Sequence, residues 1–401
     1  MDWFPSVLCL SALIKLSRHR RGSRTAVRKQ LPVMPPSPLP PLYAVWMDQC
    51  LAGPIPQESD ASCADCAMLA DGHHRPSRTE VFFNAQTKCC TYIPAIPNFL
   101  AGRILADRDP DFASGRATLE ARLRAGVVVT PLGLDQPPTF LALYEQSSSS
   151  LFGLSRAVRC PHYMPDEGGR CGIWNHRASV CATWYCKYVR GETGLRFWKT
   201  MHQLLTAVET SLARWCVLEL DIGAEALRRV FPLPGRPSRS GSIAAPALDG
   251  VPDPAEEKAL WGSWAGREGE FYAECAQLVN ALDWSDVIAI GGPELQVFAH
   301  LLREAYDKLT SEEIPERLKV GAVRIVKMNQ DSCCVTTYSE YDPLSVPKRL
   351  VEVLGHFDGR LTDQALEAIA AQEGIRLSPP LVRKLTDFGV LVPDEDLAPQ
   401  D

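Results

Sequence analysis

Residues 160–186 read CPHYMPDEGGRCGIWNHRASVCATWYC. This stretch holds four cysteines, at positions 160, 171, 181 and 186, interleaved with Gly, Pro and Arg. A hydrophobic core does not need thiols at this density, whereas a metal site or a set of bridges does. Our first hypothesis is therefore that these cysteines bind a metal.

A second group of cysteines lies upstream, as Cys63-Ala64-Asp65-Cys66 and the adjacent pair Cys89-Cys90. Four thiolates complete a tetrahedron around zinc, and four also hold an iron–sulfur cluster. Eight cysteines between residues 63 and 186 suit two such sites, or one cluster with spare thiols. The spacing matches neither the paired zinc ribbon nor the bacterial ferredoxin run, so zinc and an iron–sulfur cluster both stay open. The predicted metal ligands are Cys63, Cys66, Cys89, Cys90, Cys160, Cys171, Cys181 and Cys186.

The same residues could also have roles that need no metal. Cys63 and Cys66 could form a redox dithiol, although no βαβ pattern surrounds them. The cysteines of residues 160–186 could pack as small apolar side chains without a metal. His162 and His176 lie among the thiols, where we expect a hydrogen-bonded structural role more than ligation. The remaining cysteines are expected to pack or to lie at the surface: Cys9, Cys50, Cys216, Cys275, Cys333 and Cys334.

Charge is uneven along the 401 residues. Residues 1–46 carry seven Lys/Arg and one Asp, a net charge of +6, and the remainder carries 35 Lys/Arg against 47 Asp/Glu, a net charge of −12. The acidic remainder argues against nucleic acid as the main partner. The apolar run at 3–16 is too short to span a bilayer, and its charges follow it, so we expect a cytoplasmic protein with no membrane or export segment. In the reducing cytoplasm, clustered thiols indicate metal ligands before disulfides.

Composition divides the chain into five predicted parts. Residues 1–46 are basic and Pro-rich and are expected to be a disordered extension, with Met47 as the favoured start of translation. The other parts are a cysteine-cluster metal-binding domain at 47–231, a Pro- and Ser-rich linker at 232–262, a helical segment at 263–312 and a winged-helix-like domain at 313–396. The predicted fold class is α+β: a mostly helical cysteine-cluster domain followed by helices and the winged-helix-like C-terminal unit.

Local patterns predict the elements. We expect helices after Pro97 and at residues 116–125, 195–230, 267–283 and 294–309, and strands at 80–83, 127–130 and 139–143. Residues 320–328 and 333–341 are expected to pair as a hairpin, followed by three short helices within 346–389 and a closing strand at 390–392. Three helices of this length with β-structure are typical of a winged-helix-like unit.

The predicted C-terminal unit is acidic. Residues 343–401 carry six Lys/Arg against ten Asp/Glu, a net charge of −4, whereas a DNA-binding unit shows the reverse. Winged-helix units also bind peptides. We therefore expect a protein or peptide partner at this end of the chain.

The cysteine pattern resembles that of the YkgJ-type zinc- or iron-chelating cysteine-cluster family, over residues 60–190. The matching text is Cys63-x-x-Cys66, Lys88-Cys89-Cys90, Cys160, Gly169-Arg170-Cys171-Gly172-Ile173-Trp174, His176-Arg177, Cys181 and Cys186. The resemblance implies a bound metal, zinc or iron, and a relative with a similar cysteine pattern methylates lysines of flagellin. Two features differ from the family pattern: 22 residues separate Cys66 from Cys89, and Ala178 follows Arg177 where Pro is common.

These observations lead to two classes of function. The first is a cytoplasmic metal-binding protein whose acidic C-terminal unit recruits a protein partner. The second is an iron–sulfur-dependent enzyme that modifies proteins, such as a lysine N-methylase. No glycine-rich cofactor loop follows a clear strand and no Ser/His/Asp set stands out, so no catalytic residue is assigned. A metal-responsive transcription factor would need a basic recognition face that the sequence lacks.

Overall fold

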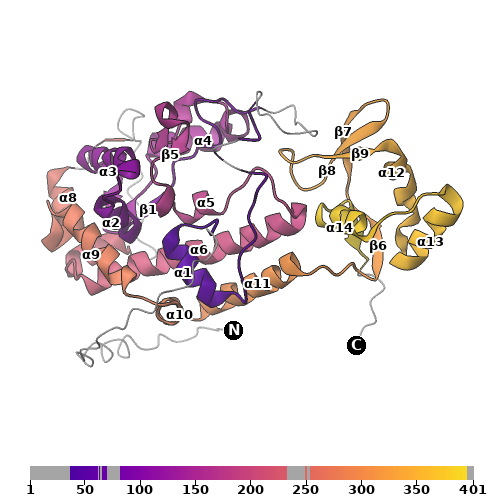
Figure 1. Cartoon of the computed structure of the whole chain (residues 1–401). Coiled ribbons are helices and arrows are strands. Elements are labelled where there is room, and N and C mark those ends of the chain that lie inside the picture. Colours follow the sequence, from indigo (N-terminus) through magenta and orange to yellow (C-terminus); the bar gives the residue numbers. More distant parts are fainter. Residues whose placement is uncertain are drawn as a thin grey trace, which may run out of the picture. The chain divides into compact units, whose positions relative to one another are not determined.

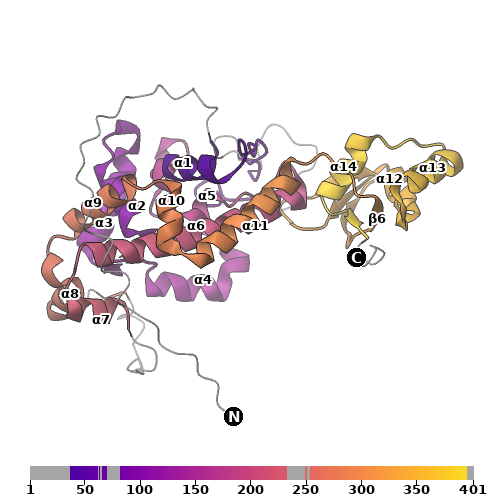
Figure 2. The same cartoon turned by 90° about the horizontal axis from the view of Figure 1, so that it is seen from below.

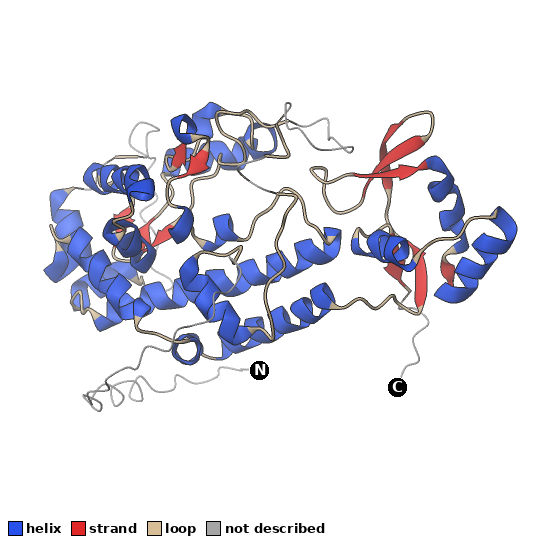
Figure 3. Ribbon diagram, in the orientation of Figure 1, coloured by secondary structure: helices blue, strands red, loops and turns tan. Residues whose placement is uncertain are grey.

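The computed structural model describes residues 37–61, 63, 66–69, 82–232, 249–250 and 253–394. The described residues from Ser37 onward form one compact unit. Helices predominate over short strands, as Figure 3 shows, and the predicted α+β class is confirmed.

The larger of the two main hydrophobic cores lies in the part of the chain before residue 311. Its helices and those that surround it are α1 (Pro41–Cys50), α2 (Asn98–Ala106), α3 (Ala113–Ala125), α4 (Pro138–Leu151), α5 (Ser179–Ala182), α6 (Gly191–Glu219), α7 (Ala224–Val230), α8 (Pro254–Trp261), α9 (Glu268–Asn280), α10 (Trp284–Gly291) and α11 (Pro293–Thr310). Single 3₁₀ turns lie at η2 (Pro110–Phe112), η3 (Arg156–Val158), η4 (Pro165–Glu167), η5 (Trp174–His176) and η7 (Gly262–Trp264).

Helix α6 is central to this core because its apolar side chains recur every three or four residues and form one continuous stripe. Phe197, Met201 and Leu212 on this stripe are fully buried. Helix α11 packs beside α6, as both Figure 1 and Figure 2 show. Helix α2 approaches α9 so closely that a Cβ on Gly102 would lie 1.8 Å from the carbonyl oxygen of Tyr272.

Two small antiparallel sheets lie in the same part of the chain. One has the order β1 (Ile96–Pro97), β3 (Gly133–Leu134), β2 (Val129–Thr130). The other pairs β4 (Tyr163–Met164) with β5 (Arg170–Cys171), so that Tyr163 lies opposite Cys171. This second hairpin holds one of the predicted ligands.

A separate hydrophobic core lies in the C-terminal part and contains Leu318, Val335 and Phe357. One sheet has the order β10 (Asp358–Leu361), β6 (Arg317–Val320), β11 (Leu391–Pro393), and the other has the order β7 (Arg324–Met328), β8 (Ser332–Thr336), β9 (Leu344–Pro347). The helical elements are α12 (Lys348–Val353), η8 (Leu354–His356), α13 (Thr362–Glu373) and α14 (Pro379–Asp387). The predicted hairpin, three helices and closing strand are confirmed.

The prediction that residues 1–46 do not pack is wrong for residues 37–46. Helix α1 begins at Pro41, and Tyr43 and Trp46 are completely buried in the larger core. The hydroxyl of Tyr43 donates a hydrogen bond to the carboxylate of Glu209 on α6. Met47, the predicted start, is buried in the middle of this helix. Residues 1–36 lie outside the described residues.

Other elements also differ from the prediction. Residues 139–143 are helical within α4, because Phe140 and Tyr144 stack one helical turn apart. Residues 195–230 form two helices, since Asp221 and Gly223 adopt positive φ angles of 42° and 90° between α6 and α7. Residues 254–261 of the predicted linker form α8. Phe82 and Phe83 of the predicted strand at 80–83 are not in a strand, and residues 80–81 lie outside the described residues.

Within the described part of the chain, no helix is both long enough and apolar enough to cross a bilayer.

Candidate metal centre

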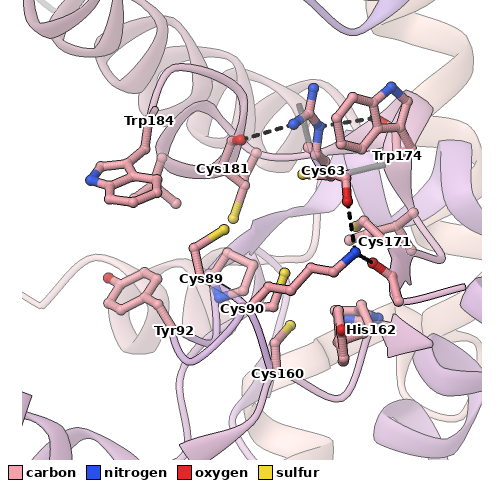
Figure 4. A pocket seen from close by; sticks show the side chains of 18 of the residues that line it. Cys63, Cys89, Cys90, Tyr92, Cys160, His162, Cys171, Trp174, Cys181 and Trp184 are labelled. Atoms are coloured by element: carbon pink, nitrogen blue, oxygen red, sulfur yellow. Dashed lines mark hydrogen bonds between the residues drawn. The ribbon is translucent and has the colours of Figure 1, made fainter. Parts of the chain in front are cut away.

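Six of the eight predicted ligands border a single hollow of about 360 Å³. They come from three separate stretches of sequence: Cys63, then Cys89 and Cys90, then Cys160, Cys171 and Cys181. Figure 4 shows the sulfur atoms of Cys89, Cys90, Cys160 and Cys181 around this shared space. The fold therefore brings together thiols that lie up to 118 positions apart in the chain, from 63 to 181.

Backbone hydrogen bonds hold the cysteine-bearing loops against one another. The amide of Cys160 donates to the carbonyl of Cys90 over 2.9 Å, which joins the second and third stretches directly. The amide of Gly172, next to Cys171, donates to the carbonyl of His162 over 2.8 Å. These bonds fix the backbone of the loops independently of their side chains.

Contacts with the larger core fix the position of Cys181. It lies on the short helix α5, whose first residue, Ser179, donates to Glu209 through its amide over 2.6 Å and its hydroxyl over 2.7 Å. Glu209 is buried on α6 and also accepts from Tyr43. Burial raises the pKa of Glu209 even though these donors lower it. One carboxyl group thus connects α1, α5 and α6 behind the thiols.

The remaining two predicted ligands, Cys66 and Cys186, lie next to the hollow rather than on its wall. Both pack in a small apolar cluster with Met68 and Phe83, and Cys89 packs against the same cluster. Burial, and then the neighbouring thiol of Cys66, raise the pKa of Cys186 to about 12. Cys89 therefore connects the two groups of thiols.

No cysteine in the described part of the chain forms a disulfide. Burial and the nearby thiol of Cys171 raise the pKa of Cys181 to about 12. Burial likewise raises the pKa of Cys160, and the thiols of Cys181 and Cys171 add to this effect. At neutral pH, and without a metal, these sulfur atoms are protonated, so a bound cation must displace protons.

The two histidines of the motif have different surroundings. His162 is fully buried, borders the hollow and contacts the Thr118 hydroxyl through Nδ1 over 2.7 Å. Its buried Nε2 atom has no hydrogen-bond partner among the described residues, and burial lowers the pKa of the ring to about 3, so the imidazole is neutral. His176 lies 2.8 Å from Asp107 Oδ2 and does not border the hollow.

Several residues of this site were not predicted as functional. Lys88 and Arg177 border the hollow, and part of its remaining wall is aromatic, from Tyr92, Tyr144, Phe152, Trp174 and Trp184. Arg177 stacks on Trp174 with its guanidinium carbon 3.5 Å from the ring centre. Lys88 and Arg177 are adjacent to the cysteine motifs in sequence, which is the one signal that pointed to them. A second hollow, of about 660 Å³, shares Cys63, Cys171, Trp174 and Arg177 with the first.

The donor chemistry of the hollow fits a thiolate-bound metal. As the side chains lie, no three His, Cys, Asp or Glu residues of the described ranges form a group that could hold one ion. Six thiols and the side chain of His162 nevertheless border one space. Six is more than the four ligands that one tetrahedral zinc ion takes, so the set also suits a cluster of several metal atoms.

Comparison of the chain with protein-family models, with curated proteins and with solved structures finds no match.

Proposed function

We propose that this protein binds zinc or an iron–sulfur cluster through the cysteines that surround the hollow. The observation that supports this most directly is the convergence of Cys63, Cys89, Cys90, Cys160, Cys171 and Cys181 on one space. Cys66 and Cys186, which pack beside Cys89, would complete a second site or serve as alternative ligands. We place the protein in the cytoplasm, where free thiols persist.

The chain's own residues would act by presenting and shielding thiolates. A bound metal would supply charge to hold the loops together and, if it is an iron–sulfur cluster, a redox centre. The backbone bond between Cys160 and Cys90 and the anchoring of Ser179 by Glu209 fix the positions of the ligand loops. The aromatic wall limits access of water to the thiols.

The test is metal analysis of the full chain purified without oxygen. We expect zinc, or iron with sulfide and absorption near ~400 nm, at about one or two sites per chain. Single Cys-to-Ser changes at Cys90, Cys160, Cys171 and Cys181 are each expected to lower the metal content. Cys334→Ser serves as the control, because Cys334 lies on β8, away from the hollow.

Two results would contradict the proposal. One is a full chain that contains neither metal under these conditions. The other is a metal content that stays the same in all four site variants and in the control.

A protein-modifying enzyme is the second candidate. The second hollow also borders Cys63, Cys171 and the Trp174–Arg177 stack, and could hold a substrate beside a bound cluster. Calorimetric binding of S-adenosylmethionine to the metal-loaded chain would favour a methylase. Absence of binding by both the loaded and the metal-free chain would remove that option.

We infer that residues 313–396 form a winged-helix-like unit that recruits a protein. In support, α12, α13 and α14 surround one core with the β10–β6–β11 sheet. Strand β7 is an edge strand with five exposed residues, among them Ile325, Val326 and Met328. An exposed edge can add a strand from an extended peptide. Chemical-shift changes confined to β7 on addition of a partner would support this, and changes elsewhere would not.

A further inference from the structure

Three cationic side chains are buried in the described part of the chain: Lys88, Arg177 and Lys187, which are 7%, 8% and 5% exposed. Lys187 has an anionic partner, because its ammonium lies 3.3 Å from Asp342 Oδ1. Lys88 and Arg177 both border the thiol-lined hollow. Within the described ranges, neither forms an ion pair with a carboxylate.

Both cations contact neutral carbonyl oxygens instead. The ammonium of Lys88 donates to the carbonyls of Cys63 over 2.6 Å, Gly169 over 2.8 Å and Gly168 over 3.4 Å. The guanidinium of Arg177 donates to the carbonyls of Cys181 over 3.1 Å and Trp174 over 3.3 Å. The two cations thus face the loops that hold three predicted ligands, Cys63, Cys171 and Cys181.

Removing a cation from water is costly unless an opposite charge lies close to it. Dipoles of carbonyl groups compensate only part of this cost. Lys187 shows that this chain can provide a carboxylate for a buried cation. The walls of the hollow instead offer thiols, which become anionic when they bind a metal. Four thiolates around a dication leave a net charge of about −2.

We propose that Lys88 and Arg177 are the counterions of an anionic metal–thiolate assembly, and that the hollow therefore selects a group of net negative charge. This inference depends on the proposed function, which it deepens. Each cation acts through the ligands and is a positioning residue in that sense. Its role combines charge compensation with the hydrogen bonds that hold the ligand loops.

The direction of the electrostatic effects agrees with this assignment. The hydrogen bond to Cys89 and burial raise the pKa of the Cys63 thiol, and Arg177 and Lys88 act against that rise. Arg177 acts in the same direction on the thiols of Cys171 and Cys181.

The experiment separates charge from shape at both positions. Lys88→Gln and Arg177→Gln remove the charge and keep a hydrogen-bond donor, whereas Lys88→Arg and Arg177→Lys keep the charge. Arg196→Gln is the control, because Arg196 on α6 is 75% exposed, pairs with Glu192 and does not border the hollow. Metal affinity of the full chain is measured without oxygen by competition with a chelator, and unfolding in urea is measured with and without metal.

We expect each Gln variant to bind metal about 10- to 100-fold more weakly, the scale of other residues that support metal ligands. The charge-retaining variants should recover most of the affinity, and the control should match the wild type. The loss of stability should be larger in the metal-loaded chain than in the metal-free chain. If the metal is an iron–sulfur cluster, the Gln variants should also have a more negative reduction potential, because a nearby cation favours the more negative reduced state.

Equal affinities in the Gln and charge-retaining variants would overturn the inference, and so would equal losses of stability with and without metal. A Gln variant that does not fold even without metal would also contradict it, since the cation would then be needed for folding itself. A wild-type chain that binds no metal would refute the proposed function instead. The two failures are therefore distinguishable.

Discussion

At the scale of single residues, the contacts of a side chain determine its role in this protein more than its chemical type does. His162 and His176 lie in the same motif, yet one borders the hollow and the other contacts Asp107 away from it. Lys88 and Lys187 each precede or follow a predicted ligand, and only Lys187 has a carboxylate partner within the described residues. These differences come from contacts with residues far away in the sequence.

His176 makes the stability of the fold depend on pH. Burial lowers its pKa, and the hydrogen bond to Asp107 only partly opposes this. Below the unfolded-state pKa of about 6.5, His176 binds a proton in the unfolded chain but stays neutral in the folded chain. The free energy of unfolding should therefore fall between pH 7.5 and pH 5.5, by up to about 1 kcal/mol from this residue. Urea unfolding of the wild type and His176→Gln measures it as their difference.

The control for this prediction is His300→Gln, because His300 is 69% exposed on α11. Parallel pH profiles of the wild type and His176→Gln would show that burial of this ring has no net effect. A difference of the opposite sign would mean that Asp107 raises the pKa of His176 more than burial lowers it.

At the scale of elements, burial of a strand follows from its place in the sheet. Strands β7 and β8 form one hairpin, but β7 is at the edge and β8 is central. Every residue of β7 is exposed, whereas Cys333 and Val335 of β8 are 2% exposed. Both strands have β-rich composition, so their local sequence did not distinguish them.

The same Val-to-Ala substitution should therefore lower the free energy of unfolding by different amounts on the two strands of this hairpin. Val335→Ala removes two methyl groups from a packed core and should lower the free energy of unfolding by about 2 kcal/mol. Val326→Ala is made on a side chain that is 46% exposed and should change it by less than about 0.5 kcal/mol. Urea unfolding of both variants makes the comparison. Equal costs would show that Val326 is covered in solution.

At the scale of the whole molecule, α1 belongs to the larger core. Tyr43 and Trp46 have no exposed surface, and Tyr43 reaches Glu209 behind Cys181. The average composition of residues 1–46 did not predict this helix. The basic and Pro-rich part of that range is followed directly by the apolar stretch Leu42-Tyr43-Ala44-Val45-Trp46.

A chain that begins at Met47 should consequently be much less stable than one that begins at Ser37. Loss of a buried aromatic side chain costs about 3–5 kcal/mol, and two such losses approach the whole stability of an ordinary protein. We expect the longer chain to show a cooperative unfolding transition and the shorter one to be insoluble or to unfold without cooperativity. Equal unfolding midpoints would mean that α1 does not contribute to the core.

Local sequence was sufficient for several elements. Helices α2, α9 and α11, the hairpin of β7 and β8, and the final helices with β11 all follow patterns that depend on neighbours three or four positions away, or on alternation. Local sequence failed for α4, where residues 139–143 were predicted to form a short strand. There the stacking of Phe140 on Tyr144 across one turn shows the helical spacing.

The sequence by itself determined the α+β class, the positions of most helices and the eight cysteines as candidate ligands, because helical periodicity and thiol spacing are properties of near neighbours. Only the tertiary structure decided which thiols share a space, placing six around one hollow and leaving Cys66 and Cys186 beside it. It also decided that Lys88 and Arg177 lie buried at that hollow, and that α1 supports it through Glu209. The reason is physical: convergence of distant segments and burial of charge depend on how α6 and its neighbours pack, which no short window of sequence contains.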